Sequence, residues 1–380
     1  MFRFFFILVL FLILPDLLIW WNFTRLHTGF WRTAMLITPT VLTMFCMLLL
    51  VCQVRVGWLM QVAFLLLICI AVPKLVFILV ALLGKLIAWG NPDVQHVIMR
   101  VGVVLAVLMA AVQIYGSVWG WRKLEVHRPA VKLEGLPAAF AGYRIVQLSD
   151  LHLGTYAGDT SFTAALVDSV NACKPDLIVF TGDLVNSASE ELLPHLRVLS
   201  RLRATDGIYS IMGNHDYCTY HPGLTPAEQH REVQRVIRSQ RTMGWHVLLN
   251  EHVAITRGSD TIYVAGVENI GKPPFPSRGN LTKALAGIPA GACVVLLSHD
   301  PWHWRHGVVG NTDVQLTLSG HTHALQMQVG KFSPAQWFMP EWAGLYKHGS
   351  QTLYVSTGIG GSVPYRLGAW PAIELFELKP

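Results

Sequence analysis

Four long apolar stretches fill the first 120 residues of this 380-residue chain, and they constrain its fold more than any other feature. They run near Phe4–Trp21, Ala34–Val51, Trp58–Ala88 and Val97–Trp119. Each approaches or exceeds the roughly 20 residues that a helix needs to cross a bilayer. Although Arg3 precedes the first stretch, its apolar core is too long for a signal peptide and no small-residue cleavage site follows. We therefore predict an all-α transmembrane anchor of about four spans in residues 1–120.

The third apolar stretch leaves the topology open. It carries Pro73 and Lys74 at its middle, so it forms either one kinked helix or two short spans, and we favour one helix. Four spans would place both chain ends on one face, and the positive-inside tendency then makes that face cytoplasmic. The basic residues that follow the last span support this orientation, whereas Arg25 and Arg32 in the first outer loop oppose it. We predict a multi-pass protein of the cell (inner) membrane with its globular part in the cytoplasm.

The positive charge of the chain belongs to the apolar part. Residues 1–120 hold seven Lys and Arg against two acidic residues, whereas the remaining 260 residues hold 22 basic and 21 acidic side chains. This distribution favours membrane topology and headgroup contacts, and it excludes a nucleic-acid patch on the globular part. Lys74, Lys85 and Arg100 lie near breaks or ends of the apolar stretches, where they can snorkel, so we predict an anchor rather than a transporter.

Beyond a linker predicted over residues 121–140, the segment 141–380 alternates short apolar runs with helical or loop segments. Their length and Val, Ile and Leu content are typical of buried strands in an α/β domain. The predicted strands are Tyr143–Leu148, Leu177–Phe180, Gly207–Ile211, Thr261–Ala265, Cys293–Leu297, Val314–Leu318, Leu353–Val355 and Ile373–Glu377.

Five of these strands end in side chains that bind metals. The blocks that follow them contain Asp150 and His152, Asp183, Asn214 and His215, His299, and His321 and His323. Ligand sites gather at the carboxyl ends of strands in such sheets. Carboxylate and imidazole without thiolate suit Mn, Fe or Zn. Two such cations about 3.5–4 Å apart can share a bridging hydroxide and stabilise displacement at phosphorus. Asp183, which stands alone at its strand end, is the natural bridging carboxylate.

The blocks D-x-H, G-D, G-N-H-D, S-H-D and G-H-T-H, in this order, resemble those of the calcineurin-like metallophosphoesterases over roughly residues 141–380. The resemblance implies a four-layer α-β-β-α sandwich and two divalent metal ions. It implies that one metal is held by Asp150, His152, Asp183 and His323, and the other by Asp183, Asn214, His299 and His321. His215 would act as the general acid, and Asp216 would orient it. One departure is visible, because Ala324-Leu325-Gln326 follows G-H-T-H where many relatives have Gly-Gly-Gln.

The resemblance also implies a reaction. With its four spans and S-H-D-P block, the chain looks most like bacterial membrane-bound members, including those that resemble pyrophosphatases cleaving UDP-diacylglucosamine. We predict a membrane-anchored phosphoesterase that hydrolyses phosphodiester or pyrophosphate bonds of a phosphorylated, lipid-linked substrate. Two alternatives stay open: a tethered phosphodiesterase for soluble nucleotides, and a non-catalytic metal-bound sensor.

Three further features carry two interpretations each. His303 and His306 either line the site or pack ordinarily. Four arginines at helical spacing on Ala227–Arg241 form either a solvated face or a phosphate-recognition face. The aromatic segment Phe332–Leu345 either belongs to the core or enters the bilayer interface.

Overall fold

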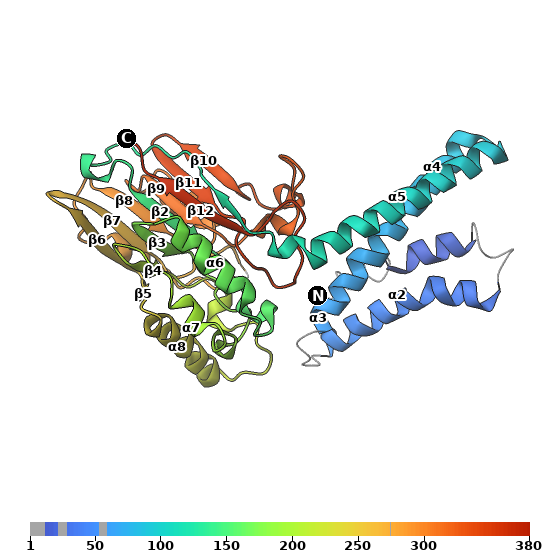
Figure 1. Cartoon of the computed structure of the whole chain (residues 1–380), viewed down its shortest axis with the longest axis horizontal. Coiled ribbons are helices and arrows are strands. Elements are labelled where there is room, and N and C mark those ends of the chain that lie inside the picture. The colour runs from blue at the N-terminus through green and yellow to red at the C-terminus, as the bar shows by residue number, and fades with distance from the viewer. Residues whose placement is uncertain (1–11, 22–28, 53–58, 274) are drawn as a thin grey trace. The chain divides into compact units, whose positions relative to one another are not determined.

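The structure is a computed structural model that describes residues 12–21, 29–52, 59–273 and 275–380. The chain divides into two compact units, residues 1–119 and 120–380. The first is helical and the second contains all twelve strands of the described residues (Figure 1).

The first unit consists of apolar helices. Residues 12–21 are helical, and the helices that follow are α2 (Phe30–Val51), α3 (Leu59–Leu66), α4 (Val72–Ala88) and α5 (Pro92–Val118). Among the described residues, three helical segments are long and apolar enough to cross a membrane: Thr33–Val51, Leu59–Ala88 and Pro92–Arg122. They correspond to the second, third and fourth predicted spans. The first predicted span, Phe4–Trp21, lies partly outside the described residues.

The third predicted span is one continuous helix. A π-helical turn, η2 (Leu67–Ala71), joins α3 to α4 directly before Pro73. Proline lacks a backbone N–H and clashes with the preceding turn, and a π turn is a common way of accommodating such a break. The expectation of one helix, in place of two short spans, therefore agrees with the structure, and the π turn lies close to Pro73, where we expected a kink.

Lys74 does not snorkel as we expected from the sequence. Its Nζ donates to the Oδ1 of Asp16 at 2.6 Å, to the carbonyl of Leu36 at 2.6 Å and to the Oγ1 of Thr40 at 3.2 Å. Both charged side chains are largely buried, at 15% and 7% exposure. A charge in an apolar environment is tolerated when it is paired and hydrogen-bonded, and Asp16 provides that pair from the helical residues 12–21.

The second unit is built on two six-stranded sheets. The first has the order β1-β12-β2-β3-β4-β5 and the second the order β10-β11-β9-β8-β7-β6. Strands β2 to β5 run parallel to one another, and so do β7, β8, β9 and β11. The strands are β1 (Glu125–His127), β2 (Arg144–Leu148), β3 (Leu177–Phe180), β4 (Ile208–Ser210), β5 (His246–Val247), β6 (Glu251–Arg257), β7 (Asp260–Gly266), β8 (Cys293–Leu297), β9 (Leu316–Ser319), β10 (Gly344–His348), β11 (Gln351–Val355) and β12 (Ala372–Glu377).

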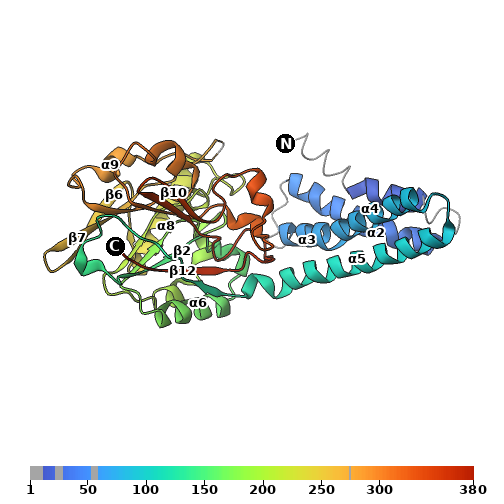
Figure 2. The ribbon, with the colours of Figure 1, turned by 90° about the horizontal axis from the view of Figure 1, so that it is seen from above.

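The apolar side chains form three layers of core. Alternate residues of β2 and β3, such as Ile145 and Leu177, pack between the two sheets against Val295 and Leu316. The opposite face of the first sheet packs against α6 (Ser161–Ala172) and α8 (Pro226–Thr242). The outer face of the second sheet packs against α9 (Leu281–Leu285) and the turn Trp304–Val308. Figure 2 shows α6 and α9 on opposite sides of the strands, which confirms the predicted four-layer α-β-β-α sandwich.

The remaining helical segments of this unit are short. They are α7 (Leu196–Leu199) and the 3₁₀ turns Gly120–Arg122, Ala138–Phe140, Leu153–Tyr156, Ser189–Leu192, His215–Tyr217, His323–Gln326 and Pro334–Trp337.

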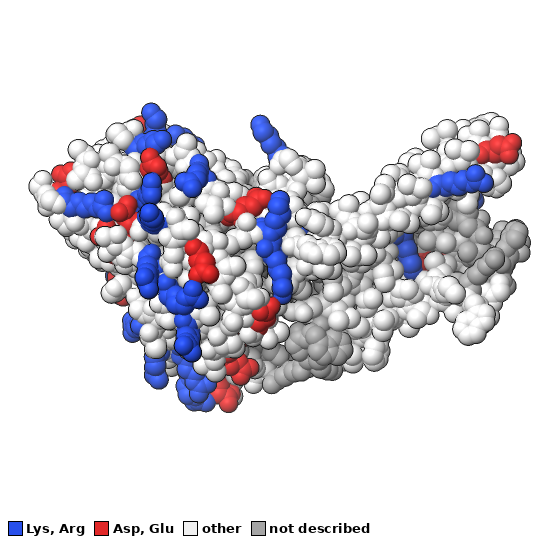
Figure 3. Space-filling model, viewed as in Figure 1, with Lys and Arg blue, Asp and Glu red and all other residues white. Residues whose placement is uncertain are grey.

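Helix α8 begins where its sequence predicts a helix. Thr225 caps it, since its side chain accepts from the Glu228 N–H while Glu228 accepts from the Thr225 N–H, and Pro226 occupies the first turn. Its four arginines are exposed, and Arg231 and Arg235 pair with glutamates on the same helix. Figure 3 shows basic and acidic side chains interspersed on one face of the second unit. These observations favour the solvated-face interpretation.

The stretch 121–140 belongs to the second unit instead of forming a linker. Glu125–His127 pairs with β12 as the edge strand β1, and Leu133 and Phe140 are fully buried between the sheets. The short length of β1 explains why its sequence carries little strand signal.

Candidate metal centre

The structure brings the predicted metal-binding residues together at the carboxyl ends of the parallel strands. Asp150 and His152 follow β2, Asp183 follows β3, and Asn214 follows β4. His299 follows β8, and His321 and His323 follow β9. Both sheets therefore contribute to one site. Three groups in it have ligand atoms within 4.8 Å of one another: Asp150, His152 and His323; His152, Asp183 and His215; and Asp183, His299 and His321.

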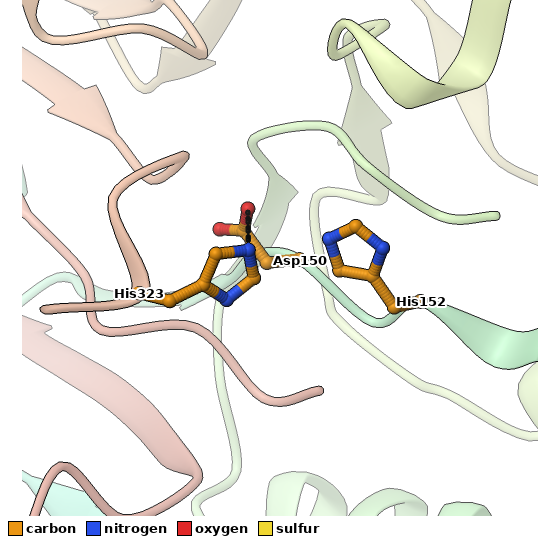
Figure 4. A group of neighbouring side chains, drawn as sticks. All are labelled: Asp150, His152 and His323. Carbon is orange, nitrogen blue, oxygen red and sulfur yellow. Dashed lines mark ion pairs between the residues drawn. The ribbon is translucent and has the colours of Figure 1, made fainter. Parts of the chain in front are cut away.

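The first group is shown in Figure 4, where Asp150 lies between His323 and His152. The Nε2 of His323 is 3.4 Å from the Oδ1 of Asp150. His152 is fully buried, and neither of its ring nitrogens has a hydrogen-bond partner among the residues that the structure describes. Its Nε2 lies 3.7 Å from the Oδ2 of Asp183. A buried imidazole with two unsatisfied nitrogens is costly unless a ligand completes it, and a metal ion would do so.

Another group consists of Asp183, His299 and His321. The Nε2 of His299 is 3.1 Å from the Oδ2 of Asp183 and 3.1 Å from the Oδ1 of Asn214. The other ring nitrogen of His299, Nδ1, donates to the Thr181 carbonyl at 2.7 Å, which fixes the tautomer and directs Nε2 into the site. His321 packs edge to face against His299, with ring centroids 5.1 Å apart. Asp183 is therefore common to two of the three groups, and it lies 3.7 Å from the Nε2 of His152 in the remaining one.

An unusual backbone conformation places these side chains. Asp150, His152, Asp183, His321 and His323 all have φ between 46° and 72°, in the left-handed region. Side chains other than glycine rarely adopt this conformation, which costs about 1–3 kcal/mol each and concentrates at functional sites. The sharp turns let residues two apart in the chain direct their side chains to the same centre.

Two glycines allow the strand ends to approach one another. A Cβ at Gly320 would overlap with the side chains of Ser149 and Asp150. A Cβ at Gly213 would overlap with the Asp183 carboxylate. The glycines of the G-H-T-H and G-N-H-D blocks are therefore required by close packing around the ligands.

His215 belongs to one of the three groups, together with His152 and Asp183, and is half-buried. Its Nδ1 is 2.7 Å from the carbonyl of Asn186, so this nitrogen donates, and its ring packs edge to face on His152. The Asn186 carbonyl holds the ring and leaves Nε2 as the nitrogen that can exchange a proton. His215, His321 and His323 are the partly exposed members of the site, whereas the other predicted ligands are buried. Solvent therefore reaches the site past these three rings.

Asp216 has a different role from the one the sequence suggested, since its carboxylate does not hold His215. Its Oδ2 accepts from the backbone N–H groups of Asp183 and Gly213, each at 2.9 Å. Its Oδ1 accepts from those of Leu184 at 2.8 Å and Val185 at 3.2 Å. The turn after Gly213 directs the side chain inward, under the neighbouring strand end. Asp216 thus fixes the backbone that carries Asp183.

Burial controls the protonation of the site. It lowers the pKa of His152 to about 3 and that of His321 to about 4, so both rings are neutral at pH 7. Burial also raises the pKa of Asp150 to about 6. Although burial works against its charge, the adjacent imidazoles of His299 and His215 hold the pKa of Asp183 well below its usual range. The neutral rings of His152 and His321 and the ionised Asp183 are in the states that metal ligands need. Although burial works against its charge, Asp183 raises the pKa of His299 to about 10, so a metal that binds His299 would displace a proton from its Nε2. With that exchange, these residues fit a metal site.

Sequence reasoning missed several supporting residues. The hydroxyl of Tyr220 accepts from the side-chain amide of Asn214, a predicted ligand, at 2.9 Å. Arg366 is buried, donates to three backbone carbonyls, and lies 3.5 Å from the Nδ1 of His323. The Oδ2 of Asp300, the last residue of the S-H-D block, is 3.6 Å from the Nε2 of His321. Of these three supporting residues, Asp300 alone lies within one of the five sequence blocks, so it alone could have been predicted from the sequence. Tyr220 and Arg366 lie outside the blocks.

The two remaining histidine candidates pack ordinarily. His303 is buried and its Nδ1 is 2.8 Å from the Ser298 hydroxyl, whereas His306 is exposed and stacks on Trp302. Neither belongs to the three groups that could hold a metal.

Comparisons with known proteins agree with the geometry. The family model described as calcineurin-like phosphoesterase matches residues 143–325. The chain is 30% identical over 312 residues to a transmembrane protein with metallophosphoesterase domain of Danio rerio, covering 78% of this chain and 68% of that one. A Bos taurus protein of the same name is 32% identical to this chain over 261 residues, which cover 66% of this chain and 56% of that protein. The uncharacterized metallophosphoesterase YkuE of Bacillus subtilis is 31% identical over 67% of this chain and 86% of YkuE.

Proposed function

The chain belongs to the calcineurin-like phosphoesterase family, and on this premise we propose that it hydrolyses phosphodiester or pyrophosphate bonds at a membrane with two divalent metal ions. The substrate that we propose is lipid-linked. We propose Mn, Fe or Zn as the metals, and the cell (inner) membrane, with residues 141–380 in the cytoplasm, as the location.

One observation carries the two-metal proposal. Two groups of metal-binding side chains flank Asp183, one with Asp150, His152 and His323, the other with His299 and His321. The unsatisfied ring nitrogens of His152 support a ligand in the first group. In the second group, the amide oxygen of Asn214 provides a further atom that could bind a metal, 3.1 Å from the Nε2 of His299. We assign one metal to Asp150, His152, Asp183 and His323, and the other to Asp183, Asn214, His299 and His321.

The residues divide the work of hydrolysis. Two bound cations would polarise the phosphate and activate a water molecule for in-line attack. His215 would protonate the leaving oxygen through Nε2, because Nδ1 is engaged by the Asn186 carbonyl. The partly exposed His321 and His323 would face the entering phosphate. Asp216 would act through the backbone by fixing the position of Asp183.

The membrane supports the choice of substrate class. Helices that can span a bilayer precede the phosphoesterase unit in the same chain. A tether of this kind raises the encounter rate with substrates in the same bilayer far above that with dilute soluble ones. A lipid-linked phosphate is the substrate that gains from this arrangement.

The test compares the full chain, purified in detergent with added Mn²⁺, with its Asp183→Asn variant. We expect metal-dependent hydrolysis of bis-p-nitrophenyl phosphate and faster hydrolysis of UDP-diacylglucosamine. Asp183→Asn should lower kcat/KM by at least about 100-fold, since changes that only support a metal ligand already cost 10–100-fold. Asp313→Asn, which alters an exposed carboxylate in the loop before β9, is the matched control and should leave the rate unchanged.

The alternatives give different results in the same assay. A tethered phosphodiesterase for soluble nucleotides would hydrolyse cyclic or linear nucleotides faster than the lipid. A metal-bound sensor would contain two metals per chain by elemental analysis and turn over none of these substrates. Removal of the metals with a chelator should abolish hydrolysis, and re-addition of Mn²⁺ should restore it. Turnover that persists after complete metal removal would refute the two-metal proposal.

A further inference from the structure

An apolar loop, Val329–Phe338, projects from the phosphoesterase unit next to the metal centre. Val329 is 72% exposed, Trp337 68% and Phe338 69%, and Phe332 is also exposed. The core interpretation of the segment Phe332–Leu345 is therefore wrong for Phe332, Trp337 and Phe338. Exposed aromatic side chains that lie close together are unusual on a soluble surface and mark an interaction site.

The exposed side chains are held by an ordered backbone. Val329 and Phe332 exchange two backbone hydrogen bonds, at 2.8 and 3.0 Å, around a turn at Gly330. The 3₁₀ turn Pro334–Trp337 follows, and the Oγ of Ser333 caps it by accepting from the Ala335 N–H. The rings of Phe332 and Trp337 then pack edge to face with centroids 5.5 Å apart. The loop thus presents its apolar side chains in a fixed arrangement.

The base of the loop is attached to the segment that carries the predicted metal ligands. The Ser333 hydroxyl donates to the Ala324 carbonyl at 2.7 Å, and Ala324 directly follows His323. Ser333 and Ala335 are fully buried at this junction. The N–H of Gln328 donates to the Leu367 carbonyl at 2.7 Å on the other side. Whatever binds the loop is therefore placed at a fixed position relative to His323.

The charge and composition of the loop indicate the kind of surface to which it binds. From Ala324 to Pro340, Lys331 is the single charged residue, and it stands at the tip between Val329 and Phe332. Tryptophan and phenylalanine with an adjacent lysine are the side chains that enter the boundary between lipid headgroups and acyl chains, where the cation meets phosphate.

We propose that the apolar loop Val329–Phe338 docks into the interface of a phospholipid bilayer and presents the metal centre to phosphates at that surface. The bilayer is the partner favoured by the sequence, because the span Pro92–Arg122 leads directly into the phosphoesterase unit. A tethered surface binds at high effective concentration, so even a small apolar patch suffices. The docking itself is independent of catalysis, whereas presentation of a lipid phosphate rests on the proposed function.

Photo-crosslinking tests the docking directly. The full chain carrying Phe338→p-benzoylphenylalanine is reconstituted into vesicles of phosphatidylcholine and phosphatidylglycerol, irradiated, and analysed for lipid adducts by mass spectrometry. The matched control is Ser259→p-benzoylphenylalanine, in the exposed turn between β6 and β7 at the opposite end of β7 from the metal centre. We expect at least about tenfold more lipid adduct at position 338, as an apolar side chain inserted into the interface would give. Equal yields, or adducts at 338 with protein alone, would overturn the proposal.

An activity comparison separates this proposal from the proposed function. The double variant Trp337→Asp/Phe338→Asp should hydrolyse soluble bis-p-nitrophenyl phosphate as the wild type does. It should hydrolyse UDP-diacylglucosamine in vesicles at least about tenfold more slowly, because two buried aromatic contacts with the lipid are lost. Equal loss on both substrates would indicate damage to the site and overturn the presentation role. If the wild type turns over neither substrate, the proposed function fails, and the crosslinking result still decides the docking.

Discussion

Replacement of Asp216 by asparagine distinguishes a backbone-fixing role from a role in proton transfer. The carboxylate accepts four backbone N–H groups, two on each oxygen, from the strand ends that carry Asp183 and Gly213. Asparagine has nearly the same shape, but it can accept at one oxygen only. Its NH₂ group would face two N–H donors that have no other acceptor in this turn.

The magnitude follows from these four bonds. A hydrogen bond to a charged group contributes about 1.5–3 kcal/mol, so the loss of two costs about 3–6 kcal/mol. For a unit of this size, each kcal/mol lowers Tm by roughly 2–4 °C, which gives a decrease of roughly 6–24 °C. The displaced turn also moves Asp183, so metal affinity should fall by at least about tenfold, as for other residues that support metal ligands.

The assay is thermal unfolding of the full chain in detergent, with metal content measured on the same samples. Asp168→Asn is the control, because it removes an exposed carboxylate paired with Arg201 and should cost less than about 1 kcal/mol. We also expect residual activity of Asp216→Asn to keep the wild-type pH profile, since the His215 ring is held by Asn186. An Asp216→Asn protein with wild-type Tm and metal content but a shifted pH profile would refute this reasoning and restore the role predicted from the sequence.

Three further predictions concern other parts of the chain. Gly320→Ala should abolish metal binding, because its Cβ would displace Asp150, and a folded variant with full metal content would contradict this. Hydrogen bonding to Glu374 raises the pKa of His127 from 6.5 to about 9 despite burial. The pair therefore stabilises the fold fully below pH 6.5, and its contribution is lost as the pH rises through about 9. Wild-type Tm should fall more steeply over that window than the Tm of His127→Gln, and equal slopes would refute this. Lys74→Met leaves Asp16 buried without its cation, so it should destabilise the helical unit by about 3–5 kcal/mol in a detergent unfolding assay. Adding Asp16→Leu should restore stability, and failure of that rescue would count against the pairing.

The strands that the sequence predicts and those that it misses differ in their position. All eight predicted strands are present, and they occupy the interior of the two sheets. Interior parallel strands are buried on both faces, so they appear as continuous apolar runs such as Cys293–Leu297. The four missed strands, β1, β5, β6 and β10, are the four edges. Edge strands are short or polar because they face solvent, and an edge such as Glu251–Arg257 therefore has no apolar run to detect.

The sequence predicted the candidate metal ligands but did not predict how the supporting residues contact them. Ligand candidates were visible because a strand end followed by Asp or His is a local pattern. The direction of a side chain within a turn is not local, so Asp216 could not be told apart from a partner of His215. The pair of Lys74 with Asp16 joins residues on different helices, and only their packing brings the two charges together.

The strained backbone at the strand ends requires rigid surroundings, and the two sheets provide them. Five residues of the centre have left-handed backbone conformations, each costing about 1–3 kcal/mol, and His152 is buried with no hydrogen-bond partner in the described part of the chain. Such costs persist only where the surrounding structure leaves the chain no alternative. Here β2, β3, β8 and β9 are almost entirely buried, and Gly213 and Gly320 at the neighbouring strand ends leave no room for a side chain. The two sheets therefore hold the ligand atoms in place before any metal arrives, so that binding does not have to order them.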